Sequence, residues 1–144
     1  MTESALKRVM AIDYGEKRVG IAVTDPLRLF AYPLITLKNS ANLLSEIKEL
    51  LTEYECDTIV LGYPLKESGE HSSSTELVLK FKDSLLGITS LPVKLVDERY
   101  SSAVAQERIL QSVSSKKKRR DKSLVDKNAA CVILEDYLSG EGKR

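Results

Sequence analysis

The stretch "AIDYGEKRVGIAVTD", residues 11–25, decides the fold of this chain. Apolar residues flank a short polar segment that contains a glycine, and this pattern predicts two strands, Val9–Ile12 and Val19–Val23, joined as a hairpin. Asp13 comes directly after the first strand. It can simply begin the turn, where Asp and Gly are favoured, or it can be a ligand for a metal ion or a phosphate. The stretch by itself leaves both interpretations open.

The rest of the chain predicts further strands alternating with helices. After the hairpin we expect three strands, at Leu29–Leu37, within 57–64 and within 92–99. Four helices lie between and after these strands along the chain: one from Asn39 or Ser40 to about Glu55, one ending at Gly87, one from Ser101 or Ser102, and one from about Leu124 to Leu138. Pro33 favours a sheet edge or a bulge. The uninterrupted apolar run in 57–64 favours an interior strand. This order predicts an α/β fold with a mixed sheet and helices on both faces.

Length and composition limit the class of protein. The chain has 144 residues, 42% hydrophobic and 30% charged, which is typical of one globular domain spanning residues 1–144. No apolar run approaches the roughly 20 residues that span a bilayer, and the N-terminus has no signal-peptide pattern. Cys56 and Cys131 lack the spacing of metal or disulfide sites, so we expect buried thiols. These features predict a cytoplasmic protein with no membrane partner.

Three carboxylates are candidate metal ligands. Asp13 and Glu98 follow predicted strands, and Asp126 lies near the start of the last helix. In open α/β sheets, ligands bind beyond the carboxyl ends of the strands. If the two strands run parallel and adjacent, the three acids meet at one edge without an evident basic partner, and Mg²⁺ or Mn²⁺ would neutralise them. Two such ions would support phosphodiester hydrolysis, one activating water and the other stabilising the leaving oxygen.

Each acid also has a purely structural interpretation. Glu98 can pair with Arg99 at the surface. Asp126 can belong to a capping box in which Ser123 is the N-cap residue. Catalysis through a Ser-His-Asp arrangement has little support, because His71 is the single histidine of the chain.

A basic run stands just before the last helix. Residues 116–122, "KKKRRDK", carry six positive charges and one negative, so the remainder of a chain with net charge +1 carries −4. Lys116, Lys117, Lys118, Arg119 and Arg120 are therefore candidates for contacts to nucleic-acid phosphates. The run has no aromatic residue for base stacking. A solvated loop is the alternative interpretation.

Four motifs follow one another along the chain: "IDYGEKRVGIAVTDP" (12–26), "VLGYPLKESG" (60–69), "VKLVDERYSS" (93–102) and "KSLVDKNAACVILEDYL" (122–138). In order and spacing they resemble the YqgF family of pre-16S rRNA nucleases, also known as Holliday-junction-resolvase-like proteins. The resemblance implies an RNase H-like nuclease domain, with Asp13, Glu98 and Asp126 as an acidic triad that binds metal. After Pro-Leu the family often has Asn, whereas this chain has Lys66. A substrate contact that the family makes through the side-chain amide of this Asn is therefore not expected in this chain.

The resemblance implies hydrolysis of nucleic acid, with more than one possible substrate. The leading hypothesis is a Mg²⁺- or Mn²⁺-dependent nuclease, using two ions, that processes the 5′ end of precursor 16S rRNA in association with the ribosome. The alternatives are a Holliday junction resolvase acting on branched DNA, an RNA-binding ribosome factor without enzymatic activity, and an actin-like nucleotide-binding protein.

Overall fold

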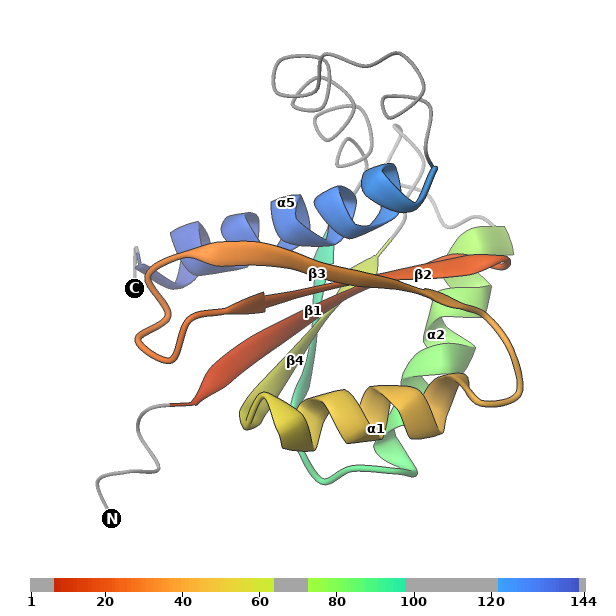
Figure 1. Ribbon diagram of the computed structural model, residues 1–144. Helices are drawn as coiled ribbons and strands as arrows, with labels where there is room; N and C mark the ends of the chain where they lie inside the picture. Colours follow the sequence, from red (N-terminus) through yellow and green to blue (C-terminus); the bar gives the residue numbers. More distant parts are fainter. Residues whose placement is uncertain (1–6, 64–72, 98–121, 143–144) are drawn as a thin grey trace.

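The computed structural model describes residues 7–63, 73–97 and 122–142, which form one mixed sheet with helices on both faces (Figure 1). The strands are β1 (Arg8–Tyr14), β2 (Arg18–Thr24), β3 (Ala31–Lys38), β4 (Cys56–Tyr63) and β5 (Val93–Asp97), and the helices are α1 (Leu43–Glu53), α2 (Ser73–Leu86) and α5 (Lys122–Gly142). The strand order is β3-β2-β1-β4-β5. β2 is antiparallel to both of its neighbours, whereas β1, β4 and β5 run parallel. The predicted α/β class is confirmed.

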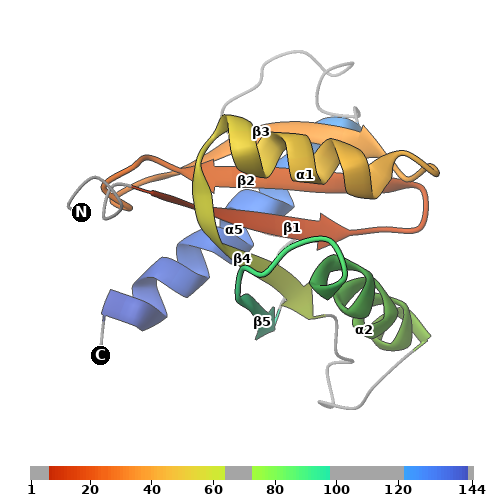
Figure 2. The same cartoon turned by 90° about the horizontal axis from the view of Figure 1, so that it is seen from below.

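Alternation along the strands builds a separate core on each face of the sheet. Met10 and Ile12 of β1 belong to the core that α1 and α2 cover, whereas Val9 and Ala11 belong to the core that α5 covers. Figures 1 and 2 show α5 on one side of the sheet and α1 with α2 on the other. Because successive side chains of a strand point to opposite faces, residues of odd number in β1 and of even number in β2 face α5.

The third strand lies at the sheet edge, as Pro33 predicted. Ile21 pairs with Ile35, but the next residue, Ala22, pairs with Pro33, so β3 has one extra residue at Leu34. A proline lacks the N–H that a second neighbouring strand would need, and an extra residue in one strand is a β-bulge. Both the edge position and the bulge therefore follow from local chemistry.

The first helix begins later than the sequence indicated. Asn42 stands at the cap position of α1 and makes no side-chain cap bond, so the predicted start at Asn39 or Ser40 is wrong. The side-chain amide of Asn39 instead donates to the carbonyl of Gly15 at 2.8 Å. Ser40 Oγ accepts from the N–H of Asn42 at 3.2 Å. These polar side chains close the connection into the helix and hold it against the β1–β2 turn.

Both cysteines are free and buried, as expected from their spacing. Burial raises the pKa of the Cys56 thiol to about 11, so this thiol stays protonated at neutral pH. Within residues 7–63, 73–97 and 122–142, no helix combines the length and apolar character needed to cross a membrane. The helix expected from Ser101 or Ser102 lies outside the described residues.

Candidate active site

The three parallel strands end at one edge of the sheet. Ile12, Leu61 and Leu95 are in register across β1, β4 and β5, so these strands point their carboxyl ends the same way. β4 lies between the other two. β1, which includes Asp13, and β5, which ends just before Glu98, are therefore parallel, as the sequence hypothesis required. The hypothesis also required them to be adjacent, and this part is wrong, because β4 separates them. We call this edge the carboxyl rim; its last strand residues are Tyr14, Tyr63 and Asp97.

Asp13 is half-buried on the face of the sheet that α5 covers. Val9 and Ala11 are buried in the core beneath α5, and Asp13 continues the same alternation. Its partner across the antiparallel pair is Gly20 of β2. Asp13 therefore has a residue without a side chain beside it, on the face where α5 crosses the sheet.

Gly20 allows the backbone of α5 to touch the sheet next to Asp13. A β-carbon at Gly20 would lie 2.0 Å from the carbonyl oxygen of Asp126 and 2.4 Å from its carbonyl carbon, far inside contact distance. Only glycine permits this approach. Because β-carbons of paired residues lie about 4.5–5.5 Å apart, the Asp126 backbone comes within roughly 8 Å of the Asp13 β-carbon. The fold thus brings two of the three predicted acids together.

Arg18 holds the carboxylate of Asp126. Its Nε lies 2.7 Å from Asp126 Oδ2, and the side chains are 37% and 22% exposed, respectively. Arg18 and Gly20 are two positions apart in β2, so they share the face beneath α5. The expectation that the acids lack a basic partner is therefore wrong for Asp126. The reason is that a residue of the hairpin meets a helix 108 positions further along the chain.

Asp126 is not a capping residue. α5 begins at Lys122, which places Ser123 inside the helix and Asp126 in its second turn. Only the first four N–H groups of a helix lack a partner within it, and in α5 those belong to residues 122–125. The capping-box interpretation is wrong, and the side chain of Asp126 is directed to Arg18 instead.

Several predicted site residues lie outside the described part of the chain. These are Glu98, the basic residues Lys116, Lys117, Lys118, Arg119 and Arg120, and also Lys66 and His71. Among the residues that the structure does describe, no three His, Cys, Asp or Glu side chains form a group that could hold a metal ion. The described part of the site is the pair Asp13 and Asp126, with Arg18 and Gly20 beside it.

Sequence reasoning missed Arg18 and Gly20, although the sequence contained a signal for both. A glycine inside a strand often marks the close approach of another backbone, and the "RVG" stretch within residues 11–25 has this feature. Alternation then assigns Arg18 to the face of Gly20. The alternation in β2 does not say which helix packs against Gly20.

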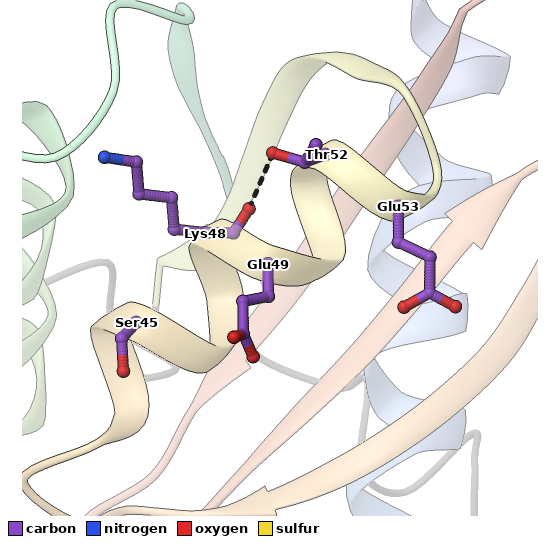
Figure 3. A pocket seen from close by; sticks show the side chains of 5 residues that line it. All are labelled: Ser45, Lys48, Glu49, Thr52 and Glu53. Carbon is purple, nitrogen blue, oxygen red and sulfur yellow. Dashed lines mark hydrogen bonds between the residues drawn. The ribbon is translucent and has the colours of Figure 1, made fainter.

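A surface hollow of about 520 Å³ lies on α1, away from the carboxyl rim and on the other face of the sheet from α5 (Figures 1 and 3). It is lined by Ser45, Lys48, Glu49, Thr52 and Glu53. Thr52 Oγ1 donates to the backbone carbonyl of Lys48 at 3.2 Å, a bond within the helix. None of Asp13, Arg18, Gly20 and Asp126 lines this hollow, so it is separate from the described part of the candidate active site.

Comparison with known proteins connects this arrangement to a family. The family model described as "RuvX: Holliday junction resolvase" matches residues 7–140. A protein of Prosthecochloris aestuarii named "Putative pre-16S rRNA nuclease" is 40% identical over 139 residues, which cover 96% of this chain and 97% of the relative. A protein of the same name from Chlorobium chlorochromatii is 39% identical over 133 residues, covering 92% and 94%.

Solved structures of junction resolvases share the fold. Thermus thermophilus RuvC in complex with a Holliday junction substrate has a TM-score of 0.59 at 15% identity, with 94% of this chain and 96% of that one covered. The fowlpox virus resolvase in complex with junction DNA has a TM-score of 0.53 at 15% identity, with 93% and 98% covered. The RNase H-like fold implied by the sequence resemblance is thereby confirmed.

Proposed function

Because this chain belongs to the RuvX (YqgF) family, whose relatives include proteins named for cleavage of precursor 16S rRNA, we propose that it is a metal-dependent nuclease that processes the 5′ end of that RNA. The observation that carries the proposal is the meeting of Asp13 and Asp126 over Gly20 at the carboxyl rim. These two acids come from the first strand and the last helix, far apart in the sequence, and the fold brings them to one place.

The donor set fits a hard divalent cation. Asp13 and Asp126 offer carboxylate oxygens, the ligands that Mg²⁺ and Mn²⁺ prefer. Glu98 follows Asp97, the last residue of β5, so chain connectivity alone keeps its α-carbon about 3.8 Å from that of a rim residue. We assign Asp13, Glu98 and Asp126 as the residues that hold Mg²⁺ or Mn²⁺, with two ions in the complete site.

The protein's own contribution to catalysis is orientation. Ions held by these carboxylates would activate water and stabilise the leaving oxygen. Asp13 is fixed by the β1–β2 pairing, and Asp126 is fixed by the contact of its backbone with Gly20 and by the bond from Arg18. A rigid arrangement of acids lowers the barrier because no reorganisation is needed when charge develops on the phosphate.

We assign substrate binding to Lys116, Lys117, Lys118, Arg119 and Arg120. The last of these five residues, Arg120, lies two positions before Lys122, the first residue of α5, and α5 carries Asp126 about one turn after Lys122. Clustered cations gain affinity for nucleic acid by releasing counterions from its phosphates, irrespective of base sequence. This chemistry suits precursor rRNA in the cytoplasm, free or in association with the ribosome.

A Holliday junction resolvase is the second candidate. The description of the family model and the two resolvases of shared fold favour it. Symmetric cleavage of a four-way junction needs two active sites related by a two-fold axis, so this activity requires a homodimer. We rank it second because the relatives of about 40% identity are named for RNA processing.

One assay separates these candidates. Precursor 16S rRNA, unrelated single-stranded RNA and a four-way DNA junction are each incubated with the protein in Mg²⁺, in Mn²⁺ and in chelator. We expect metal-dependent cleavage of the precursor, with 5′-phosphate and 3′-hydroxyl ends from direct attack by water. Preferential junction cleavage would favour the resolvase, whereas 2′,3′-cyclic phosphate ends would exclude the acidic triad.

Two further outcomes point to classes without nuclease activity. Binding of the precursor without cleavage under any metal condition would indicate an RNA-binding ribosome factor. A melting temperature that rises with the logarithm of ATP concentration, in the absence of cleavage, would indicate a nucleotide-binding protein, because a ligand that binds only the folded state stabilises it in this way.

A further inference from the structure

We propose that Arg18 is a positioning residue of the metal site: it holds one oxygen of the Asp126 carboxylate and thereby presents the other oxygen to a divalent ion shared with Asp13. The inference rests on the proposed function, since it assigns a role within the proposed site. It adds to the acidic triad a further residue, Arg18, and states that the affinity of the site for metal depends on this residue.

The geometry of the ion pair leaves part of the carboxylate for another ligand. Among the residues that the structure describes, Arg18 and Asp126 are joined by one hydrogen bond, from Nε to Oδ2 at 2.7 Å, and not by a two-pronged guanidinium–carboxylate pair. A carboxylate has two oxygens and about four lone-pair sites. One oxygen can therefore accept from Arg18 while the second binds a cation.

Arg18 is itself held rigidly. It is the first residue of β2 and pairs with Lys38 of β3. The turn before it is fastened by Asn39, whose backbone N–H donates to the carbonyl of Lys17 at 3.0 Å and whose side chain donates to the carbonyl of Gly15 at 2.8 Å. A guanidinium on so constrained a backbone can orient the residue that it binds.

Asp126 needs this second restraint. Contact with Gly20 fixes its backbone, but the side chain on a helix still has a choice of staggered rotamers. The bond from Arg18 selects one of them. The backbone contact and the side-chain contact come from the same strand, two residues apart, so β2 fixes both the place and the direction of the carboxylate.

A role in stability alone explains the pair poorly. The Arg18 side chain is 37% exposed, and ion pairs exposed to this degree contribute little to stability because solvent screens them. In metal sites, by contrast, residues that orient the ligands strongly affect affinity. A competing role predicts the reverse: a cation beside the site repels the metal ion, and its removal strengthens metal binding. The two roles predict opposite changes in affinity.

The test is a titration of Mn²⁺ into the full chain, with free Mn²⁺ followed by electron paramagnetic resonance. We expect Arg18→Gln to weaken Mn²⁺ binding by about 10- to 100-fold, with a nearly unchanged melting temperature and an intermediate affinity for Arg18→Lys. Lys17→Gln is the matched control, because it removes the same charge from an exposed neighbour in the same turn; its Mn²⁺ affinity should equal that of the wild type.

Unchanged Mn²⁺ affinity in Arg18→Gln would show that the Arg18–Asp126 ion pair is only a surface contact. Tighter Mn²⁺ binding would show that Arg18 competes with the metal ion for Asp126. Either result overturns the proposal. Should Arg18→Gln fail to fold, Arg18→Lys gives the same comparison. In an Asp126→Asn background, Arg18→Gln should cause no further loss of Mn²⁺ affinity. A loss of affinity as large as in the wild type would overturn the proposal.

The same titration separates the role of Arg18 from the proposed function. Mn²⁺ binding by a wild-type protein that cleaves no substrate would count against the nuclease function and leave the role of Arg18 standing. A wild-type protein that binds no Mn²⁺ overturns both.

Discussion

Gly20 and Asp126 are in backbone contact, with the carbonyl oxygen of Asp126 2.0 Å from where a β-carbon of Gly20 would lie. The contact joins the middle of β2 to the second turn of α5. It also sets the height of α5 above the sheet at the residue beside Asp13, which is the partner of Gly20 in β1. A methyl group at this one position would push the helix, and with it one of the proposed metal ligands, away from the sheet.

Gly20→Ala should therefore destabilise the protein and reduce nuclease activity together. Overpacking of a filled core costs about 1–3 kcal/mol, and here the obstacle is backbone, which cannot rotate aside. The free energy of unfolding in urea measures the first effect, and the cleavage rate of precursor rRNA measures the second.

Gly140→Ala is the matched control for this substitution. Gly140 lies in α5, the helix that Gly20 contacts, but a β-carbon at Gly140 would meet nothing within 4 Å. Replacing a helical glycine by alanine stabilises by at most about 1 kcal/mol, and Gly140 lies in the last turn of α5, so we expect a small stabilisation or none. Equal stabilities of Gly20→Ala and Gly140→Ala would contradict the close approach of α5 at Gly20.

Asp13→Asn, Glu98→Gln and Asp126→Asn should each reduce hydrolysis by roughly 100-fold or more, because each removes a charged ligand from ions that supply several kcal/mol of transition-state stabilisation. The asparagine in Asp126→Asn keeps an oxygen that can accept from Arg18, so this variant should stay folded. Cleavage rates at saturating Mg²⁺ and circular dichroism make the comparison. A variant that folds and cleaves like the wild type removes its residue from the site.

Replacing Lys116, Lys117, Lys118, Arg119 and Arg120 with Ala should weaken binding to all single-stranded RNA sequences alike. If about three of them contact phosphates, at roughly −0.7 per contact, the slope of log affinity against log salt should become shallower by about 2. Turnover at saturating RNA should hardly change, because binding energy shared by ground and transition states affects KM alone. Fluorescence anisotropy at several salt concentrations measures the slope; an unaltered slope would mean that the run is a solvated loop.

Cys56 should make stability fall with rising pH between about 9 and 11. Burial raises the pKa of its thiol from 9.0 to about 11, so over this interval the folded state keeps a proton that the unfolded state has lost. Stability from this group is fully present below pH 9 and is lost as the pH approaches 11. Urea unfolding of the wild type and of Cys56→Ala at several pH values isolates the effect, since the alanine variant should show a flatter decline. Identical pH dependence in the two proteins would mean that the thiol is not desolvated.

The sequence by itself determined the local elements. Two apolar runs on either side of a short polar segment with a glycine predicted the β1–β2 hairpin. Pro33 predicted the edge position of β3, because a missing N–H is a property of one residue and needs no partner to be known. The start of α1 was predicted wrongly. Asn39 and Ser40 are good capping residues, but Asn39 bonds instead to Gly15, and no local pattern reveals that contact.

Only the tertiary structure decided how the site is assembled. Periodicity assigned Asp13 to a strand end and Asp126 to a helix, but it does not say which strand a helix crosses or at what height. The contact of Gly20 with Asp126 and the bond from Arg18 to Asp126 depend on how α5 packs over the sheet, and the two bonded residues stand 108 positions apart. A sequence pattern reports which face a residue occupies; the partner on that face is fixed by the packing of the whole chain.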